Sequence, residues 1–223
     1  MYILRADCWL DLVYVVDSSG SINYKDPINW DITLEFLVNV TRQFTIGPNA
    51  VQVAFVLFSN DATVRWGLTR YQNQADLIRA IEAVPYIGDT TNLNDGLYLT
   101  RTRVFAPAQG TRSGALKAAI ILTDGEDNVP EEGTPLTLQN ATACKRDNIQ
   151  LIGIGVSDQV DEQRLRQIVS PPPDTHYYPV DDFRDLVNIV AQLTPAVCVT
   201  TTAAPTGSKE PHFTPKSTAL ADC

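Results

Sequence analysis

The sequence predicts an α/β fold of the doubly wound type, in which a mostly parallel sheet carries helices on both faces and has one antiparallel edge strand. The first observation is a set of short apolar runs, such as residues 10–16 and 118–122, typical of strands buried on both faces. The second is that segments with helical apolar spacing separate these runs, which indicates parallel strands. With 223 residues and 44% hydrophobic content, the chain can bury one such core and is too short for two.

The first half of the chain supplies two buried strands, one helix and one hairpin. After the strand at residues 10–16, Asp26 and Pro27 predict the start of a helix, because Asp caps helices and Pro is tolerated at the first helical position. The pair at 47–48, Gly-Pro, predicts its end. Residues 51–58 form a second buried run. Residues 62–66 alternate apolar and polar side chains, which predicts an antiparallel edge strand.

The second half continues the alternation. A helix is expected near residues 73–84, and a polar loop at 88–92 leads into a helix marked by Leu93, Leu97 and Val104. The third buried strand, at 118–122, ends in Thr-Asp-Gly. The remaining expected elements are a helix from residue 134 or 135 to 146, a strand at 149–156, a short helix at 162–169, a strand around 176–180 and a closing amphipathic helix with Phe183, Leu186, Val187, Val190 and Leu193.

Polar oxygens follow the first buried strand at regular spacing. Asp17, Ser19 and Ser21 stand two residues apart, so in a looped backbone their oxygens can converge on one point, which suits a hard divalent cation. The same residues are also ordinary turn and helix-capping residues, and both interpretations stay open at this point. Asp124 follows another buried strand. If the two strands are neighbours, both carboxylates lie at the carboxyl edge where the strand order reverses, which is where such folds bind ligands.

Three motifs follow one another along the chain: Asp17-Ser18-Ser19-Gly20-Ser21, Gly88-Asp89-Thr90-Thr91 and Thr123-Asp124-Gly125. In this order they resemble the von Willebrand factor type A (vWA) family, which includes integrin I domains, and the resemblance covers residues 8–198. The domain is therefore expected at 8–198, with residues 199–223 as a Thr/Pro-rich linker or tail.

The resemblance implies a metal-ion-dependent adhesion site, whose five positions fall on Asp17, Ser19, Ser21, Thr91 and Asp124. Thr91 is chosen over the neighbouring Thr90 because the family's threonine usually precedes a Gly-Leu type pair by five or six residues, and here that pair is Gly96-Leu97. Thr90 stays as the second candidate. The chain departs from many members at Leu93, where they carry a threonine.

Such a ligand set implies binding rather than catalysis. Three neutral hydroxyls and two carboxylates leave a divalent cation partly neutralised and still hydrated, so an Asp or Glu of a partner can replace a water. Mg²⁺ is the first choice, with Mn²⁺ or Ca²⁺ as substitutes. The expected function is an extracellular adhesion or matrix-assembly module that binds a protein ligand, with collagen as one candidate. The alternative is a structural matrix module whose metal site is not used for ligand binding.

The cysteines and glycosylation motifs indicate a secreted protein. Cys8 and Cys198 flank the expected domain, and because chain ends in such domains often lie close together, we expect them to form a disulfide. Cys144 is expected to be a buried free thiol, whereas Cys223 could pair with another chain, or with Cys144 if the tail folds back. Asn39 and Asn140 begin Asn-x-Thr sequons, so both are candidate glycosylation sites. We therefore expect the matrix or the cell surface as its location.

Composition excludes several function classes. The formal net charge of -9 argues against nucleic acid as a partner. The sequence has no apolar run of roughly 18 or more residues, so no membrane span is predicted. The chain has two histidines, no Ser-centred nucleophile elbow and no phosphate-binding loop, so we expect no enzyme.

The two ends of the sequence suggest a longer protein. Residues 1–7 lack the long apolar segment of a signal peptide, so secretion would need one outside the printed sequence. The composition of residues 199–223 is typical of an extended linker that leads to further domains. Within the vWA family, flanking cysteines and such a linker resemble matrilins and collagen-type chains.

Overall fold

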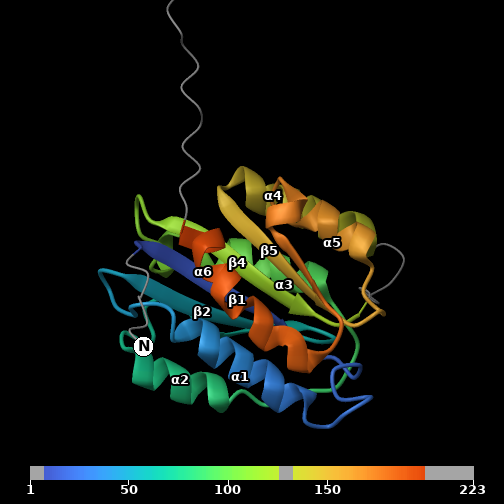
Figure 1. Cartoon of the computed structure of the whole chain (residues 1–223). Coiled ribbons are helices and arrows are strands. Elements are labelled where there is room, and N and C mark those ends of the chain that lie inside the picture. Colours follow the sequence, from blue (N-terminus) through green and yellow to red (C-terminus); the bar gives the residue numbers. More distant parts are fainter. Residues whose placement is uncertain (1–7, 126–132, 199–223) are drawn as a thin grey trace, which may run out of the picture.

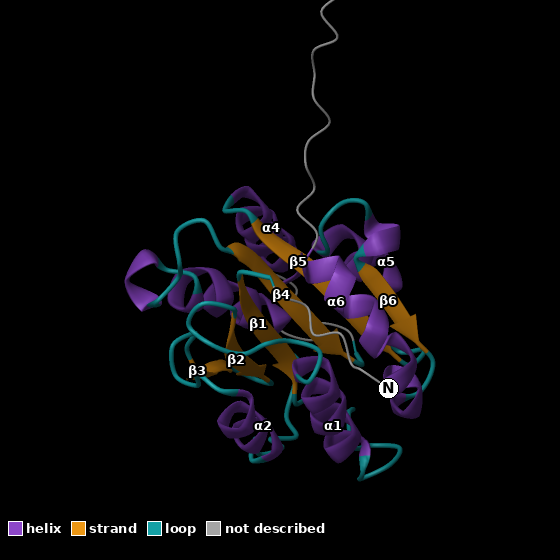
Figure 2. Ribbon diagram, turned by 60° about the vertical axis from the view of Figure 1, so that its left-hand side comes forward, coloured by secondary structure: helices purple, strands orange, loops and turns teal. Residues whose placement is uncertain are grey.

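The computed structural model describes residues 8–125 and 133–198, without the side chains of 133–135. The predictions for the 199–223 linker and for Cys223 lie outside the described residues. Within the described part, a six-stranded sheet is sandwiched between helices (Figures 1 and 2).

The sheet has the order β3-β2-β1-β4-β5-β6, and all neighbours are parallel except β2 and β3. The predicted mostly parallel sheet with one antiparallel edge strand is therefore confirmed. Because β1 lies between β2 and β4, the strand order reverses beside it, at the end where β1 and β4 stop. The strands are β1 Leu10–Asp17, β2 Val51–Phe58, β3 Ala62–Trp66, β4 Leu116–Thr123, β5 Ile149–Val156 and β6 Tyr177–Val180.

Helices cover both faces of the sheet, as expected for apolar strands. The elements α1, α2, η4 and α6 pack on one face, and Figure 1 shows α1, α2 and α6 in front of the strands; α3, η1, α4 and α5 pack on the other. None of the helices in the described residues is long and apolar enough to cross a membrane. Their bounds are α1 Asn29–Thr41, α2 Gln74–Glu82, α3 Leu93–Leu99, the π-helical η1 Thr100–Val104, α4 Gly133–Arg146, α5 Glu162–Ile168, η4 Phe183–Ile189 and α6 Val190–Cys198, with short 3-10 turns at η2 Pro107–Gln109 and η3 Pro173–Thr175.

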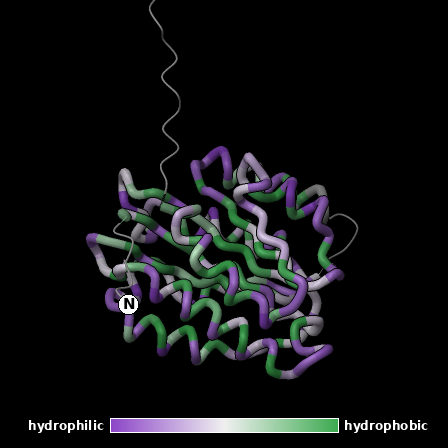
Figure 3. The backbone as a smooth tube through the Cα atoms, viewed as in Figure 1, coloured by the Kyte–Doolittle hydropathy of each residue, from purple (hydrophilic) through white to green (hydrophobic). Residues whose placement is uncertain are grey.

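Strand β1 explains why both faces need cover. Every one of its residues is buried, and its side chains alternate between two cores: Leu12 and Tyr14 belong to the α1 side, Val13 and Val15 to the α3 side. Figure 3 shows the hydrophobic residues concentrated along the central strands. A strand without a polar face cannot lie at the surface, so β1 fixes the centre of the molecule.

The first helix begins later than Asp26 and Pro27 predict. Asp26 accepts a bond from the Ile28 backbone N–H in a preceding turn, and α1 starts at Asn29. The N–H of Trp30 donates instead to the side chain of Asn23, at 2.9 Å. Because this capping acceptor lies seven residues upstream of the amide that it accepts from, rather than at the residue flanking the helix, the usual capping pattern could not reveal it.

The closing helix also differs from the prediction. Its first part, η4, is a 3-10 helix, and only the segment from Val190 onward is α-helical. A 3-10 helix has three residues per turn rather than 3.6, so the spacing that places Phe183 and Leu186 in the core leaves Val187 64% exposed. The prediction that Val187 belongs to the apolar face was therefore wrong.

The two ends of the domain meet at the amino ends of the parallel strands, at the opposite end of β1 from Asp17. The structure contains a disulfide between Cys8, just before β1, and Cys198, the last residue of α6. Cys144 of α4 is a free thiol in the core. Near the same end of β1, the buried carboxylate of Asp11 accepts two hydrogen bonds from Arg112, one from the backbone N–H and one from Nε, each 2.8 Å long.

A substitution at Gly96 tests how closely α3 approaches the sheet. A Cβ at this position would lie 3.2 Å from Val15 Cγ1 and 3.3 Å from Phe58 Cδ1, closer than side chains normally pack. We expect Gly96→Ala to lower the free energy of unfolding in urea by about 1–2 kcal/mol, despite the better helix propensity of alanine. Gly67→Ala is the control, because a Cβ there meets nothing within 4 Å. Equal stability of the two variants would show that α3 can move away from the sheet freely.

Candidate metal centre

Asp17 is the last residue of β1, and its carboxylate is buried. Its Oδ1 accepts the backbone N–H of Ser19 at 2.8 Å, and its Oδ2 accepts the hydroxyl of Thr123 at 2.6 Å. The first bond shapes the loop after β1, and the second joins that loop to the end of β4. Asp17 therefore fixes the two segments that carry the other oxygens of the site.

The hydroxyls of the β1–α1 loop meet the carboxylate that follows β4. Ser19 Oγ lies 3.0 Å from Ser21 Oγ, and Ser21 Oγ donates to Asp124 Oδ1 at 2.7 Å. Although Ser21 and Asp124 are 103 residues apart in sequence, both follow adjacent parallel strands, so they meet at one edge of the sheet. The expected proximity of the two loops is thus present in the structure.

Thr91 reaches the same place from the loop before α3. Its side chain is buried, and a Cβ on Gly125 would lie 4.0 Å from Thr91 Oγ1 and 3.5 Å from Ser21 Oγ, so both hydroxyls border the space beside Gly125. Thr90, the second candidate, is exposed and donates its hydroxyl to Asn60 Oδ1 at 3.2 Å. The geometry therefore brings Thr91, rather than Thr90, to the cluster.

Backbone bonds hold the loop before α3 against the loop after β1. Gly88 N–H donates to Ser18 O at 2.8 Å, and Gly20 N–H donates to Asp89 O at 2.7 Å. Gly88 has a φ of +84°, a conformation that glycine adopts at little cost. The hydroxyl of Ser59, in the loop after β2, holds the loop before α3 from a third direction, since it accepts from Asp89 N–H and donates to Thr90 O, each at 3.1 Å. Three loops are thereby fixed before any ligand binds.

Sequence reasoning did not assign roles to Thr123, Ser18 or Ser59, which hold the site together without belonging to the predicted ligand set. Ser18 Oγ accepts the N–H of Ile87 at 2.8 Å, and Thr123 donates to Asp17. A signal for Thr123 existed: it is a hydroxyl residue at the end of an otherwise apolar strand. Ser59 carried no such signal, because its partners lie about 30 residues away along the chain.

The electrostatics of the site favour a positively charged ligand. Burial, together with the neighbouring charge of Asp124, raises the pKa of the Asp17 carboxyl to about 7. Burial also raises the pKa of the Asp124 carboxyl to about 6, although the Ser21 hydrogen bond and the charge of Lys25 partly offset the rise. Across the described ranges neither carboxylate forms an ion pair, and Lys25 itself pairs with Asp158. Two buried carboxylates without a direct ion pair are unfavourable unless a proton or a cation joins them.

The donor set suits a hard cation that takes oxygen ligands. No cluster of three or more His, Cys, Asp or Glu side chains occurs in the described part of the chain, so a metal here would depend on hydroxyls as well as on the two carboxylates. Ser21 and Asp124 also line a cavity of about 260 Å³ that includes Tyr24, Lys25 and Arg184. The oxygen cluster is therefore reachable from the surface, and an added ligand has room beside it.

The two predicted glycosylation sites lie on separate helices, and both are only half-buried. Asn39 of α1 accepts a bond from Arg42 at 2.9 Å, and Asn140 of α4 donates to Asn94 of α3 at 2.8 Å. Neither residue contacts the oxygen cluster.

Comparison with known proteins assigns the chain to a family. The family model described as von Willebrand factor type A domain matches residues 11–192. The chain is 33% identical over 190 residues to the collagen alpha-1(XII) chain of Notophthalmus viridescens, which covers 84% of this chain and 19% of that protein. It is 29% identical over 204 residues to human matrilin-1, with coverage of 90% and 39%. The chain thus spans well under half the length of these curated relatives.

A solved structure adds a metal to the comparison. The structure of proximal thread matrix protein 1 from the mussel byssus with a zinc-occupied MIDAS motif matches with a TM-score of 0.77 and 28% identity, over 87% of this chain and 47% of that one. The relatives are matrix proteins and not enzymes, in line with the prediction from the sequence.

Proposed function

Because the chain belongs to the von Willebrand factor type A family, we propose that it binds a protein partner through a divalent cation, as an adhesion or matrix-assembly module. The domain would span residues 8–198. The residues that would hold the cation are Asp17, Ser19, Ser21, Thr91 and Asp124.

One observation carries the proposal. Burial raises the pKa of both the Asp17 and the Asp124 carboxyl, and the charge of Asp124 raises that of Asp17 further. Within the described residues, no Lys or Arg side chain forms an ion pair with either carboxylate. A folded protein rarely keeps two such charges buried without compensation. A divalent cation bound beside Ser21 and Asp124 would supply it.

The residues of the site would divide the work. Asp124 supplies a charged oxygen, and the hydroxyls of Ser19, Ser21 and Thr91 supply neutral ones, while Asp17 adds charge and holds Ser19 and Thr123 in place. A bound cation would keep part of its positive charge and an exchangeable position, which an Asp or Glu of the partner could fill. Mg²⁺ fits this all-oxygen set better than zinc does, because zinc in proteins is held mostly by nitrogen and sulfur.

The module is proposed to act outside the cell, as part of a longer protein. The Cys8–Cys198 disulfide fits an oxidising compartment, and the curated relatives are matrix proteins. Collagen is the first partner to test.

Two measurements on the same protein test the proposal. Titration calorimetry with MgCl₂ should show saturable binding of one cation. Capture on immobilised type I collagen should then require Mg²⁺ and disappear with EDTA. Calorimetry without a binding signal, for Mg²⁺ and Mn²⁺ alike, would refute the cation site. Cation binding together with collagen capture that EDTA does not change would favour the alternative of a structural module whose metal site is not used for ligand binding.

The pH dependence of stability gives an independent prediction. Between pH about 4 and about 7, the folded carboxyls of Asp17 and Asp124 retain protons that the unfolded chain, with a pKa of 3.8, has released. Unfolding then releases protons, so the free energy of unfolding of the cation-free protein falls as the pH rises through this window. We expect MgCl₂ to raise the melting temperature more at about pH 7.5 than at about pH 5, since protons compete with the cation. An equal increase at both values would contradict the assignment of these carboxyls.

A further inference from the structure

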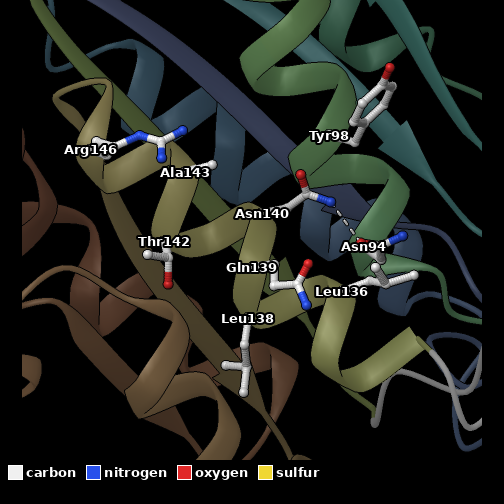
Figure 4. A pocket seen from close by; sticks show the side chains of 9 residues that line it. All are labelled: Asn94, Tyr98, Leu136, Leu138, Gln139, Asn140, Thr142, Ala143 and Arg146. Carbon is white, nitrogen blue, oxygen red and sulfur yellow. Dashed lines mark hydrogen bonds between the residues drawn. The ribbon is translucent and has the colours of Figure 1, made fainter.

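A broad groove lies between α3 and α4, away from the cluster of oxygens (Figure 4). Its volume is about 750 Å³. The two helices pack against each other below it, and Asn94, Tyr98, Leu136, Gln139, Asn140 and Arg146 contribute to its walls. This is the largest hollow that the described residues offer without a role in the proposed function.

The side chain of Asn140 is held in a defined position at this groove. Its Nδ2 donates one hydrogen bond, 2.8 Å long, to Asn94 Oδ1 across the two helices, as the dashed line in Figure 4 shows. An amide nitrogen carries two protons, so one remains for other chemistry. Asn140 also begins the sequon Asn140-Ala141-Thr142, in which Ala141 is buried and Thr142 is exposed.

The walls of the groove combine apolar surface with hydrogen-bonding groups. Tyr98 is 46% exposed and Leu136 is 44% exposed, although both are large apolar side chains. Gln139 and Arg146 also line the groove, and they contribute an amide and a guanidinium group. A sugar ring has the matching chemistry, because its C–H face packs on an apolar side chain while its hydroxyls bind amides and guanidinium groups.

We propose that the groove holds the first sugars of an N-linked glycan on Asn140. In the attachment step, Nδ2 forms a bond to the anomeric carbon of an oligosaccharide carried on a lipid diphosphate. The bond from that carbon to the diphosphate breaks, the diphosphate leaves with the electron pair, and one amide proton is released. The proton that remains on Nδ2 preserves the bond to Asn94, which then directs the glycan along the groove.

Asn39 is different, and it serves as the internal reference. It lies on α1, on the other face of the sheet, and its side-chain oxygen accepts a bond from Arg42. The proposal for Asn140 rests on the proposed extracellular location but not on the cation. Mg²⁺ titration of the same preparations tests the cation site by itself, so a failure of the glycan proposal can be told from a failure of the cation proposal.

The first test is occupancy in secreted protein from a cell line that attaches N-glycans. Peptide mapping after enzymatic deglycosylation in heavy-oxygen water should mark Asn140 in the wild type. Thr142→Ala removes the sequon without touching the Asn140–Asn94 bond, so the mark should vanish. Thr142→Ser keeps the sequon and should retain it. Wild-type protein without a glycan on Asn140 overturns the proposal, whatever the state of Asn39.

The second test asks whether the glycan lies in the groove. Hydroxyl-radical labelling should be weaker at Tyr98 and Leu136 in the glycosylated wild type than in Thr142→Ala from the same cells. Tyr24 is 87% exposed in the loop after β1, and its labelling should not change. Equal labelling of Tyr98 and Leu136 in the two proteins would show that the sugars project into solvent, and would overturn the proposal.

Discussion

Replacing Asp124 with asparagine is expected to weaken Mg²⁺ binding by about 100-fold or more while making the cation-free protein more stable at neutral pH. The affinity falls because the substitution removes one of the two carboxylates of the proposed site. The stability rises because burial makes the ionised carboxylate of Asp124 unfavourable, and asparagine avoids this cost while its Oδ1 still accepts the Ser21 hydroxyl. Titration calorimetry and urea unfolding without added cation measure the two effects.

Asp158→Asn is the matched control. It removes one negative charge from a nearby loop, but its carboxylate is exposed and pairs with Lys25 rather than with the cluster. We expect this variant to bind Mg²⁺ almost as well as the wild type. If both variants lost the same affinity, the attraction would come from the general charge of the surface, and the proposed coordination by Asp124 would be wrong.

Removing Arg112 is expected to lower the free energy of unfolding by about 3–5 kcal/mol, because it leaves a buried carboxylate unpaired. Asp11 is completely buried in β1, and Arg112 supplies its charged partner at 2.8 Å. The same guanidinium donates to the backbone oxygens of Leu10 and Pro48, at 2.7 and 2.8 Å. Arg112→Ala therefore leaves one charge and two carbonyl groups without their partner. Urea denaturation measures the loss.

The control for Arg112 is Arg184, whose side chain is 60% exposed and pairs with Asp26 and Asp182. Because solvent screens such pairs, Arg184→Ala should change the free energy of unfolding by less than about 1 kcal/mol. The double variant Asp11→Asn/Arg112→Ala should be less destabilised than the two single effects added together, since it leaves no unpaired buried charge. Additive effects would show that Asp11 and Arg112 act independently.

The sheet could be predicted because each strand has a recognisable pattern of apolar residues in its own short segment. The runs at 51–58 and 149–156 match β2 and β5 to the residue, and the alternating pattern at 62–66 gave the antiparallel β3. Strand patterns are short and need no distant partner to be recognised. The meeting of Asp17 and Asp124 was expected on the condition that their strands are neighbours, and the pairing of β1 with β4 meets this condition.

The parts that could not be predicted depend on distant residues or on a change of helix type. Asn23 caps α1 across the intervening turn, and Arg112 reaches Asp11 from 101 positions away. Asp11 lies inside the apolar run at 10–16, and a carboxylate in such a run needs a basic side chain as its partner. Nothing in the sequence identified Arg112 as that partner. At the other end, the 3-10 conformation of η4 changed the periodicity that had placed Val187 in the core.

A crystal structure of the protein soaked in MnCl₂, with anomalous diffraction, tests the central claim most directly. Mn²⁺ takes oxygen ligands as Mg²⁺ does, and its anomalous scattering reveals its position in the crystal. It can therefore stand in for Mg²⁺ at the proposed site. The proposal predicts one strong anomalous peak within about 2.0–2.2 Å of the Ser19 and Ser21 hydroxyls, with Thr91 and Asp124 completing the surroundings directly or through water. A map with no peak beside these residues, at a Mn²⁺ concentration that saturates the protein in solution, would contradict it.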